Sequence, residues 1–422
     1  MKRYEFLRSA LKLSALALCV ALVPMGAARA QEAGGDLGGG AGIFRPKNPE
    51  TTRRIKPPTG IKPPTARKST GPSAPKAAAP SPEVIEERFE DALDDGNTAR
   101  DARKYAEAEK AYREAGKLKP KDWRAWYGLG NVYTDQQRWD DAEKAYLQAS
   151  NYGNLNADIF TALSFVLIQP RTSGANAKRL ADAEIAARRA IQIQSSNAVA
   201  YDRLGAAIEA RGSSVADAEQ AYRRAVELDP QFAVANVHLA RLLRKAGRTS
   251  EAEPLYRRAI ELAKDAPTLI LIADALQSEQ RWDDSEPVLR RALEMDARNP
   301  SALFLLGRLL VVRKRYDEAE QRLKQTIEIS PRSFSPYYIL GSAYLRMDRF
   351  EDAEKIYNRG AEIANAGERK QLAGAFGFEG VGDGYMKMGR TSDALRAYQR
   401  ALQFDPNNAA LQAKIAAAKK QG

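Results

Sequence analysis

The sequence predicts an all-α protein in which helix hairpins repeat along most of the chain. The first observation is a unit that recurs about nine times between Phe89 and Pro406, with a spacing of about 34 residues. The second is that small residues recur at fixed places in this unit, where two helices would approach each other closely. The third is that the repeated region has no alternation of apolar and polar residues typical of strands. Together they predict stacked hairpins without one central core.

The repeats keep a nearly constant register. Two of the steps between repeats are longer, each by about seven residues, which is roughly two helical turns. The first insertion holds the loop-like string from Gln169 to Gly174, and the second surrounds residues 366–370. The repeats begin near Phe89, Trp123, Ala157, Ala198, Ala233, Ala266, Pro300, Phe334 and Ala375.

Several positions within the repeat have a physical reason. Small residues at the eighth position and Ala at the twentieth let two helices approach, and aromatic residues at the twenty-fourth fill the space between repeats. The eighth position holds Gly96, Gly130, Gly205, Gly307, Gly341 and Gly382, and the twenty-fourth holds Tyr112, Tyr146, Tyr222, Tyr256, Tyr357 and Tyr398. Second helices are expected to begin with capping boxes, because Asp140, Ser250, Asp283 and Asp317 each precede a Glu by three residues.

The combination of these residues has a known counterpart. Trp126-Tyr127-Gly128-Leu129-Gly130 is followed by Ala142 and Tyr146, and the same order returns at Tyr337, Leu340-Gly341, Ala353 and Tyr357. These residues resemble the tetratricopeptide repeat (TPR) family. The resemblance implies a right-handed α-solenoid of about nine TPR helix hairpins over residues 83–407. Residues 408–422, rich in Ala and Lys, are expected to form a C-terminal capping helix.

The N-terminus has the pattern of a secretory signal peptide. Basic residues precede an apolar run from Leu13 to Val23, and Ala28-Arg29-Ala30 follows. We therefore expect residues 1–30 to be a signal peptide cleaved after Ala30, and the protein to be exported to the periplasm or the cell exterior. The alternative is lipidation at Cys19, but the residue before it is not small. Cleavage after Ala30 leaves a mature chain without cysteine and hence without disulfides.

Residues 31–82 are expected to be a disordered, Gly/Pro-rich basic linker. The chain has a net charge of +12, and basic residues exceed acidic ones by four in residues 1–30 and by six in residues 31–82. The repeats themselves are therefore nearly neutral, and no specific nucleic-acid partner is expected. The linker is interpreted either as a soluble spacer or as a segment that weakly contacts an anionic envelope surface.

No catalytic chemistry is indicated. His238 is the only histidine, and the mature chain would hold no cysteine, so a histidine-based triad or metal site has no supporting partners. No P-loop is present, and the glycines from Gly374 to Gly384 do not follow a strand. We therefore expect no enzyme, no cofactor, no catalytic residues and no metal site, and we expect His238 to be an ordinary helix-surface residue.

The resemblance also implies where a partner would bind. In TPR proteins the first helix of each repeat lines a concave groove, and positions 2, 5, 9 and 12 of that helix share one stripe. The candidate partner-binding residues are Tyr127, Asn131, Arg241, Arg244, Asp274, Phe304, Arg308 and Tyr338. The arginines could bind an acidic or C-terminal peptide. Equally, they could pair with Asp274 and neighbouring acids, and the sequence leaves both readings open.

These observations favour a non-catalytic protein–protein interaction scaffold or adaptor of the bacterial envelope, with a protein or peptide partner in the concave TPR groove. The alternative is an assembly factor for a surface machine such as a pilus or a secretion system. The Lys/Asn/Lys/Arg set with which some TPR domains bind chaperone tails is not present in register, although Asn131 is.

Overall fold

Helix hairpins make up nearly all of the described chain. The structure is a computed structural model that describes residues 45–51, 81–169 and 176–421. Within these ranges the regular secondary structure is helical and no strand is present, so the all-α prediction is confirmed. The expected signal peptide, the remaining parts of the linker and most of the first insertion lie outside the described residues.

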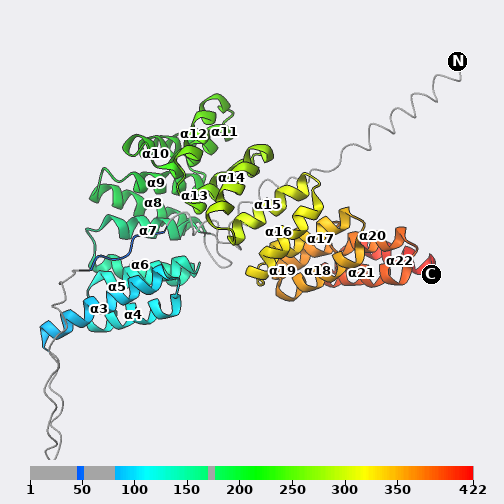
Figure 1. Ribbon diagram of the computed structural model, residues 1–422, viewed down its shortest axis with the longest axis horizontal. Helices are drawn as coiled ribbons and strands as arrows, with labels where there is room; N and C mark the ends of the chain where they lie inside the picture. Colours follow the sequence, from blue (N-terminus) through cyan, green and yellow to red (C-terminus); the bar gives the residue numbers. More distant parts are fainter. Residues whose placement is uncertain (1–44, 52–80, 170–175, 422) are drawn as a thin grey trace, which may run out of the picture. The chain divides into compact units, whose positions relative to one another are not determined.

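Along the chain, the first helices of the repeats alternate with the second helices (Figure 1). The first helices are α3 (Pro82–Asp101), α5 (Trp123–Asp135), α7 (Ala157–Leu167), α9 (Ala198–Arg211), α11 (Ala233–Lys245), α13 (Ala266–Ser278), α15 (Pro300–Val312), α17 (Phe334–Arg346) and α20 (Phe378–Lys387). The second helices are α4 (Tyr105–Leu118), α6 (Trp139–Tyr152), α8 (Asn176–Ile193), α10 (Val215–Leu228), α12 (Thr249–Leu262), α14 (Trp282–Met295), α16 (Tyr316–Ile329), α18 (Phe350–Ile363) and α21 (Thr391–Phe404). From α5 to α17, each first helix begins at the residue where the sequence places a repeat start.

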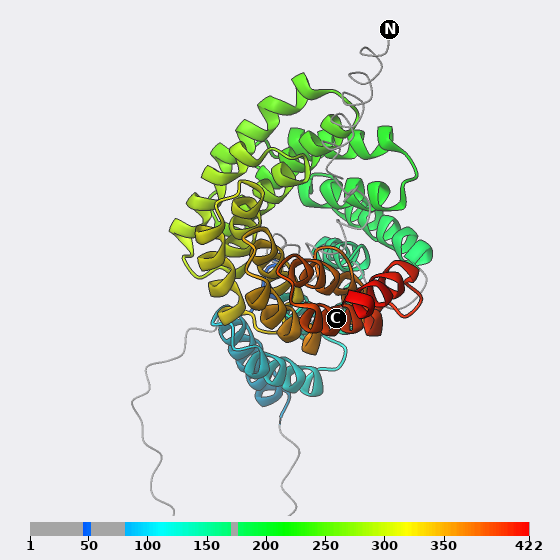
Figure 2. The same ribbon diagram turned by 90° about the vertical axis from the view of Figure 1, so that its right-hand side faces the viewer.

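The helices fall into two compact units, one with α3 to α15 and the other with α16 to α22. In the first unit the two helices of a hairpin pack on each other, and the second helix packs on the next hairpin in chain order. First helices of neighbouring repeats also meet, as α9 does with α11 and α11 with α13. In the second unit α17 pairs with α18, and α20 pairs with α21. Figure 2 draws this unit in yellow to red. The apolar side of each hairpin is therefore buried by its neighbours, as in other repeat proteins.

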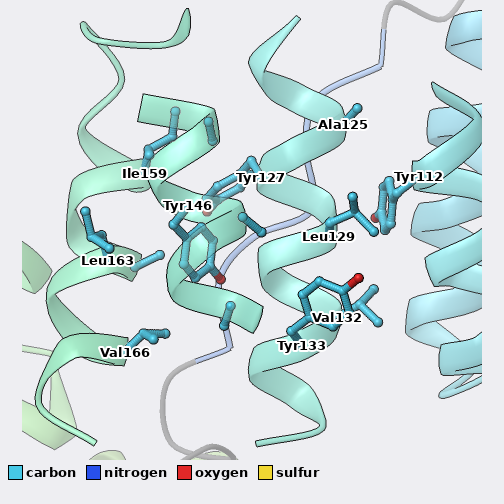
Figure 3. Packing of buried hydrophobic residues seen from close by; sticks show 14 of the residues in the cluster. Tyr112, Ala125, Tyr127, Leu129, Val132, Tyr133, Tyr146, Ile159, Leu163 and Val166 are labelled. Atoms are coloured by element: carbon cyan, nitrogen blue, oxygen red, sulfur yellow. The ribbon is translucent and has the colours of Figure 1, made fainter. Parts of the chain in front are cut away.

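The recurring small and aromatic residues form the core of each hairpin. Gly130 and Tyr146 illustrate the fit, because a Cβ added to Gly130 would lie 2.5 Å from Cε1 of the Tyr146 ring. The centroid of the Tyr146 ring also lies 5.7 Å from that of Tyr127. Figure 3 shows both side chains in the core. The alanines at the twentieth position are all fully buried: Ala108, Ala142, Ala183, Ala218, Ala252, Ala319, Ala353 and Ala394.

The starts of the second helices differ from the sequence expectation. Helix α6 begins at Trp139 with Arg138 as its N-cap, so Asp140 lies inside the first turn and makes no capping box. The preceding residue, Gln137, has a φ of 58°, which turns the chain sharply and starts the helix early. Arg138 instead pairs with Asp141 in its own helix and with Glu109 of the preceding hairpin. The same arrangement of an N-cap arginine recurs at Arg248, Arg281, Arg315, Arg349 and Arg390.

The second insertion forms a short helix, α19 (Ala366–Ala373). Its N-cap Asn365 and Glu368 form a true capping box. The last first-helix then begins at Phe378 rather than near Ala375, because a turn separates it from α19. Gly377 permits this turn, since an added Cβ would lie 2.0 Å from the carbonyl oxygen of Leu372.

Helix α22 (Ala409–Gln421) packs on α21 and covers the end of the last repeat. Lys414 of α22 forms ion pairs with Glu379 and Asp383 of α20. The expected capping helix is therefore present.

Candidate functional site

Polar side chains gather on the side of the hairpins formed by the first helices. We call this surface the first-helix face and define it, within the unit that holds α3 to α15, by the residues at positions 2, 5, 9 and 12 of each repeat. On α3 and α5 these positions include Asn97, Arg100, Arg124 and Asn131. Asn131 was expected at the site, whereas Asn97 and Arg100 were missed. The same stripe, applied to the first repeat, would have found them.

Two tyrosines hold the asparagines in place. The hydroxyl of Tyr112 donates to Oδ1 of Asn97 at 2.6 Å, and the hydroxyl of Tyr146 donates to Oδ1 of Asn131 at 2.8 Å. Burial raises the pKa of Tyr112 and Tyr146 above the ordinary value, so both hydroxyls keep their protons. Because Oδ1 is occupied, each amide presents its Nδ2 donors to the first-helix face.

A buried ion pair lies beside the asparagines. Arg100 of α3 is 1% exposed, and its guanidinium donates from Nε and Nη2 to the two carboxylate oxygens of Asp135 at 2.8 and 3.0 Å. Burial opposes the charge of Arg100, but the hydrogen bonds to Asp135 outweigh it and the pKa of the guanidinium is raised. The remaining nitrogen, Nη1, is left to bind a further acceptor.

A separate segment of the chain, Arg45 to Thr51, lies on this part of the face. It is the thin blue stretch of chain beside α5 in Figure 3. Four of its main-chain carbonyls accept hydrogen bonds from side chains of α3 and α5. They are donated by Arg100 Nη1 to Pro46 (2.7 Å), Asn131 Nδ2 to Lys47 (2.8 Å), Asn97 Nδ2 to Pro49 (3.0 Å) and Arg124 Nη1 to Glu50 (3.2 Å).

This contact corrects one expectation. Residues 45–51 fall inside the segment that the sequence predicts to be a disordered linker, yet in the structure they are bound in a defined place. The physical reason is that side chains of distant repeats satisfy their carbonyls, a source of order that local composition does not reveal. The other linker residues, 31–44 and 52–80, lie outside the described residues.

Tyr127, another expected site residue, serves the packing. It is 3% exposed, and its ring contacts Trp123 and Tyr146. Its side chain therefore packs against Tyr146, the residue that holds Asn131 in place.

The fourth and fifth repeats contribute a second polar cluster. Nδ1 of His238 lies 2.7 Å from Oδ1 of the fully buried Asp202, which also pairs with Arg203 at 2.7 Å. Burial alone would raise the pKa of Asp202, but His238 and Arg203 lower it below the ordinary value. His238 is therefore a mostly buried partner of an acid, with 12% of its side chain exposed, and not the surface residue expected from the sequence.

The expected arginines are paired with acids. Arg241 bonds to Glu209 at 2.8 Å, and Arg244 lies 2.7 Å from Glu279. Of the two readings that the sequence leaves open for these arginines, the structure contains the pairing with acids. Whether they also bind a partner stays a prediction.

The sixth and seventh repeats show the same pattern. Arg308 donates to Gln277 at 2.9 Å and to Asp274 at 3.2 Å. Phe304 is 4% exposed, and the Arg308 guanidinium lies 5.9 Å from the centre of its ring. Phe304 is thus mainly a core residue.

Tyr338 belongs to the other compact unit and is described with it. Its ring stacks on Phe334, with centroids 6.0 Å apart, and lies 6.3 Å from the ring of Tyr357. The expected site residues are therefore distributed over several local clusters, and among them Asn131 binds the segment.

Neither a metal centre nor a membrane span is found in the described residues. Within ranges 45–51, 81–169 and 176–421, no group of three or more His, Cys, Asp or Glu side chains could hold a metal ion. Among the helices of the same ranges, none is long and apolar enough to cross a membrane.

Comparison with known families gives a consistent result. Two family models described as tetratricopeptide repeat match the chain, one at residues 93–154 and 270–334 and the other at residues 213–274 and 314–373. A third, described as TPR repeat, matches residues 382–422. Together the matches cover more than half of the 422 residues. No curated protein matches the chain in a sequence search.

Three solved structures of similar fold are distant from this chain in sequence. A MamA protein is 22% identical over 42% of this chain and 92% of its own length, with a TM-score of 0.35. YrrB, described as a TPR protein with an unusual peptide-binding site, is 20% identical over 42% of this chain and 91% of its own, with a TM-score of 0.33. TTC0263, a thermophilic TPR protein of Thermus thermophilus, is 21% identical over 45% and 99%, with a TM-score of 0.39.

Proposed function

The chain belongs to the tetratricopeptide repeat family, and we propose that it is a non-catalytic protein–protein interaction scaffold of the bacterial envelope. Its partner would be a protein or peptide that binds along the first-helix face. One observation carries this proposal: side chains of α3 and α5 already hold four main-chain carbonyls of an extended segment. A surface that binds a peptide backbone in this way suits a peptide-binding module.

The chemistry of the face supports binding rather than catalysis. Its donors are amides and guanidinium groups, and its carboxylates are paired, as Asp135 is with Arg100. The imidazole of His238 contacts a carboxylate and the Tyr222 ring. Nucleophilic catalysis needs a nucleophile within hydrogen-bond reach of a base, and these contacts supply binding groups instead.

The envelope location is part of the proposal and follows from the N-terminal sequence. Basic residues, an apolar run and Ala28-Arg29-Ala30 form a signal peptide pattern. The intact mass of the protein from its native host tests it. A mature chain that begins at Gln31 supports export, and a chain that retains residues 1–30 contradicts it. Contact of the basic linker with an anionic surface stays a prediction, and such binding would weaken with salt.

Site-specific photo-crosslinking tests the binding surface. A photoreactive residue placed at Asp274, on the first-helix face, should capture a partner in living cells. The matched control is Arg258 on the second helix α12, because the exposed fractions of the two side chains are 44% and 45%. Replacing Asp274 leaves Arg308 bonded to Gln277, so local structure should persist.

The captured protein is then purified and its affinity for the wild type and the Arg241→Ala/Arg308→Ala variant is compared. An affinity change larger than the ~0.5 kcal/mol of ordinary surface substitutions supports binding on this face. Equal capture at Asp274 and Arg258, or no capture at either, contradicts it. A captured pilus or secretion-system subunit would identify the role as that of an assembly factor.

A further inference from the structure

We propose that the first-helix face of the first two repeats is a recognition site for extended basic peptides with the pattern Arg-Pro-x-Asn-Pro. In this proposal, residues 45–51 of the same chain occupy the site as an internal competitor, and a partner peptide of the same chemistry must displace them. The inference rests on the proposed binding function and names both the ligand class and its regulation.

Burial along the segment repeats every three residues. Pro46 and Pro49 are buried, Lys47 and Glu50 are exposed, and Asn48 is half-buried. A burial period of three is that of a polyproline II helix, in which every third residue returns to the same face. The face therefore accepts two prolines spaced by three residues, and it does so with a ligand conformation that costs little entropy to order.

The side chains of the site bind main-chain carbonyls of the segment. Proline has no N–H, so a proline-containing strand offers mainly acceptors. The face supplies only donors to the main chain of the segment, through Asn97, Asn131, Arg100 and Arg124. Donor side chains and an acceptor-rich ligand are thus complementary.

The side chains of Arg45 and Asn48 in the segment contact charged groups of the face, and these contacts set which peptides fit. Arg45 pairs with Asp101 at 3.1 Å and lies 3.5 Å from Asp135. Asn48 donates to Asp101 at 3.0 Å and accepts from Arg100 at 2.8 Å. The acids thus select a basic residue before the first proline, and the Asn48 amide fits between a donor and an acceptor.

Nη1 of Arg100 depends on the segment for its hydrogen bonds. Its Nη1 donates only to Pro46 and Asn48 among the contacts of the described residues. Arg100 is 1% exposed with the segment in place, and an empty site would leave this nitrogen to water. The face is therefore built to be covered, either by this segment or by a peptide that replaces it.

The site is confined to the first two repeats. Position 9 is Asn in these repeats, but Arg241, Asp274, Arg308 and Asp383 hold it in later ones. Arg241 and Arg308 bind acids of neighbouring repeats. The pair of amides that receives the segment is therefore not repeated there.

Competition within one chain can be estimated. About thirty residues connect Thr51 to Ser81, and a segment tethered over this length has an effective concentration on the order of 1 mM. If the free peptide bound an open site with a Kd of about 10 µM, the resident segment would weaken its apparent affinity about 100-fold.

The experiment measures binding of a fluorescent peptide with the sequence of residues 45–51, Arg-Pro-Lys-Asn-Pro-Glu-Thr, to the full mature chain. In the release variant Arg45→Ala/Asn48→Ala the resident segment loses its side-chain contacts, and the labelled peptide should bind about 10- to 100-fold more tightly than to the wild type. Adding Asn97→Ala/Asn131→Ala to the release variant should abolish the gain. A peptide with both prolines replaced by alanine should bind weakly to every variant.

The matched control is Lys47→Ala/Glu50→Ala. Both side chains are exposed, and the hydrogen bonds use only their main-chain carbonyls, so this variant should behave as the wild type. Equal peptide affinity in the wild type and the release variant would overturn the internal competition, and unchanged affinity after loss of both asparagines would overturn the site.

A second measurement does not depend on the labelled peptide. Lysyl endopeptidase should cleave after Lys47 slowly in the wild type and at least about tenfold faster in the release variant, provided circular dichroism shows equal helicity. Equal cleavage rates would contradict the docked segment. A concentration-dependent dimer in sedimentation, lost in the release variant, would show that the segment binds a second copy and would overturn competition within one chain. These outcomes leave the crosslinking test of the broader scaffold function independent.

Discussion

Asn97 and Asn131 occupy the same position in successive repeats, and each donates its Nδ2 to a carbonyl of the same bound segment. The acceptors, Pro49 at 3.0 Å and Lys47 at 2.8 Å, are two residues apart. Each amide is oriented by a tyrosine from the second helix of its own hairpin. In both repeats, therefore, a tyrosine that packs in the core of the hairpin also orients the asparagine that binds the segment.

The orienting hydroxyl can be removed without changing the shape of the core. In Tyr146→Phe, Asn131 loses its fixed orientation and Thr134 loses a partner 3.1 Å away. We expect a loss of about 1 kcal/mol of unfolding free energy together with faster cleavage after Lys47 by lysyl endopeptidase.

Tyr222→Phe is the control for this prediction. Tyr222 holds the same repeat position, but its hydroxyl donates to Glu209 in a repeat that does not contact the segment. The two variants should lose similar stability, measured by urea unfolding, while only Tyr146→Phe exposes Lys47. The same cleavage rate in both would contradict an orienting role for Tyr146.

Two glycines in neighbouring helices should respond oppositely to the same substitution. A Cβ at Gly130 would lie 2.5 Å from the Tyr146 ring, whereas a Cβ at Gly116 would have its nearest neighbour at 3.7 Å. Gly130→Ala should therefore destabilise the chain by about 1–3 kcal/mol through overpacking. Gly116→Ala should stabilise α4 by about 0.5–1 kcal/mol, because alanine favours the helix. Thermal unfolding followed by circular dichroism measures both, and a shift of the same sign in both would refute the packing argument.

The fold could be predicted from the sequence because its causes are local and repeated. Glycine, alanine and tyrosine recur at positions where helices meet, so counting their spacing placed the first helices correctly from Trp123 to Phe334. The capping boxes were predicted wrongly, because a positive φ at residues such as Gln137 starts the second helix earlier than the acidic residues suggest.

The site was only partly predictable. The stripe rule identified Asn131, and it would have identified Asn97 had it been applied to the first repeat. The docking of residues 45–51 could not be read from composition, because its carbonyls are satisfied by side chains about 50 to 80 residues away along the chain. The pairing of Arg308 with Asp274 depends on how neighbouring repeats align, which the sequence alone left open.

Where the structure describes the turn before a second helix, this turn contains a residue with positive φ. Gly247 fills this place with a φ of 80°, and an added Cβ would meet nothing within 4 Å. Gly247→Ala should therefore cost about 1 kcal/mol through backbone strain alone. Gly247→Asn should cost less, since asparagine tolerates this conformation. Urea midpoints measure the difference, and an alanine variant as stable as the asparagine variant would argue against strain.

The buried acid Asp202 makes stability depend on pH. His238 and Arg203 hold the pKa of Asp202 below its ordinary value despite burial. Its folded pKa is thus lower than the value of about 3.9 in the unfolded chain. The ionised group contributes its full stability above the unfolded pKa, and this contribution is lost as the pH falls through the folded pKa.

Asp202→Asn should therefore cost about 3–5 kcal/mol at pH 7, because Arg203 and His238 lose their carboxylate inside the protein. The gap between variant and wild type should begin to shrink below about pH 4 as the wild-type carboxylate gains a proton. Asp283→Asn serves as the control, since the Asp283 side chain is 89% exposed and its loss should stay within about 0.5 kcal/mol. Urea unfolding at pH 7, 5 and 3 provides the measurement. A gap between Asp202→Asn and the wild type that stays constant over this range would show that the charge of Asp202 does not stabilise the fold.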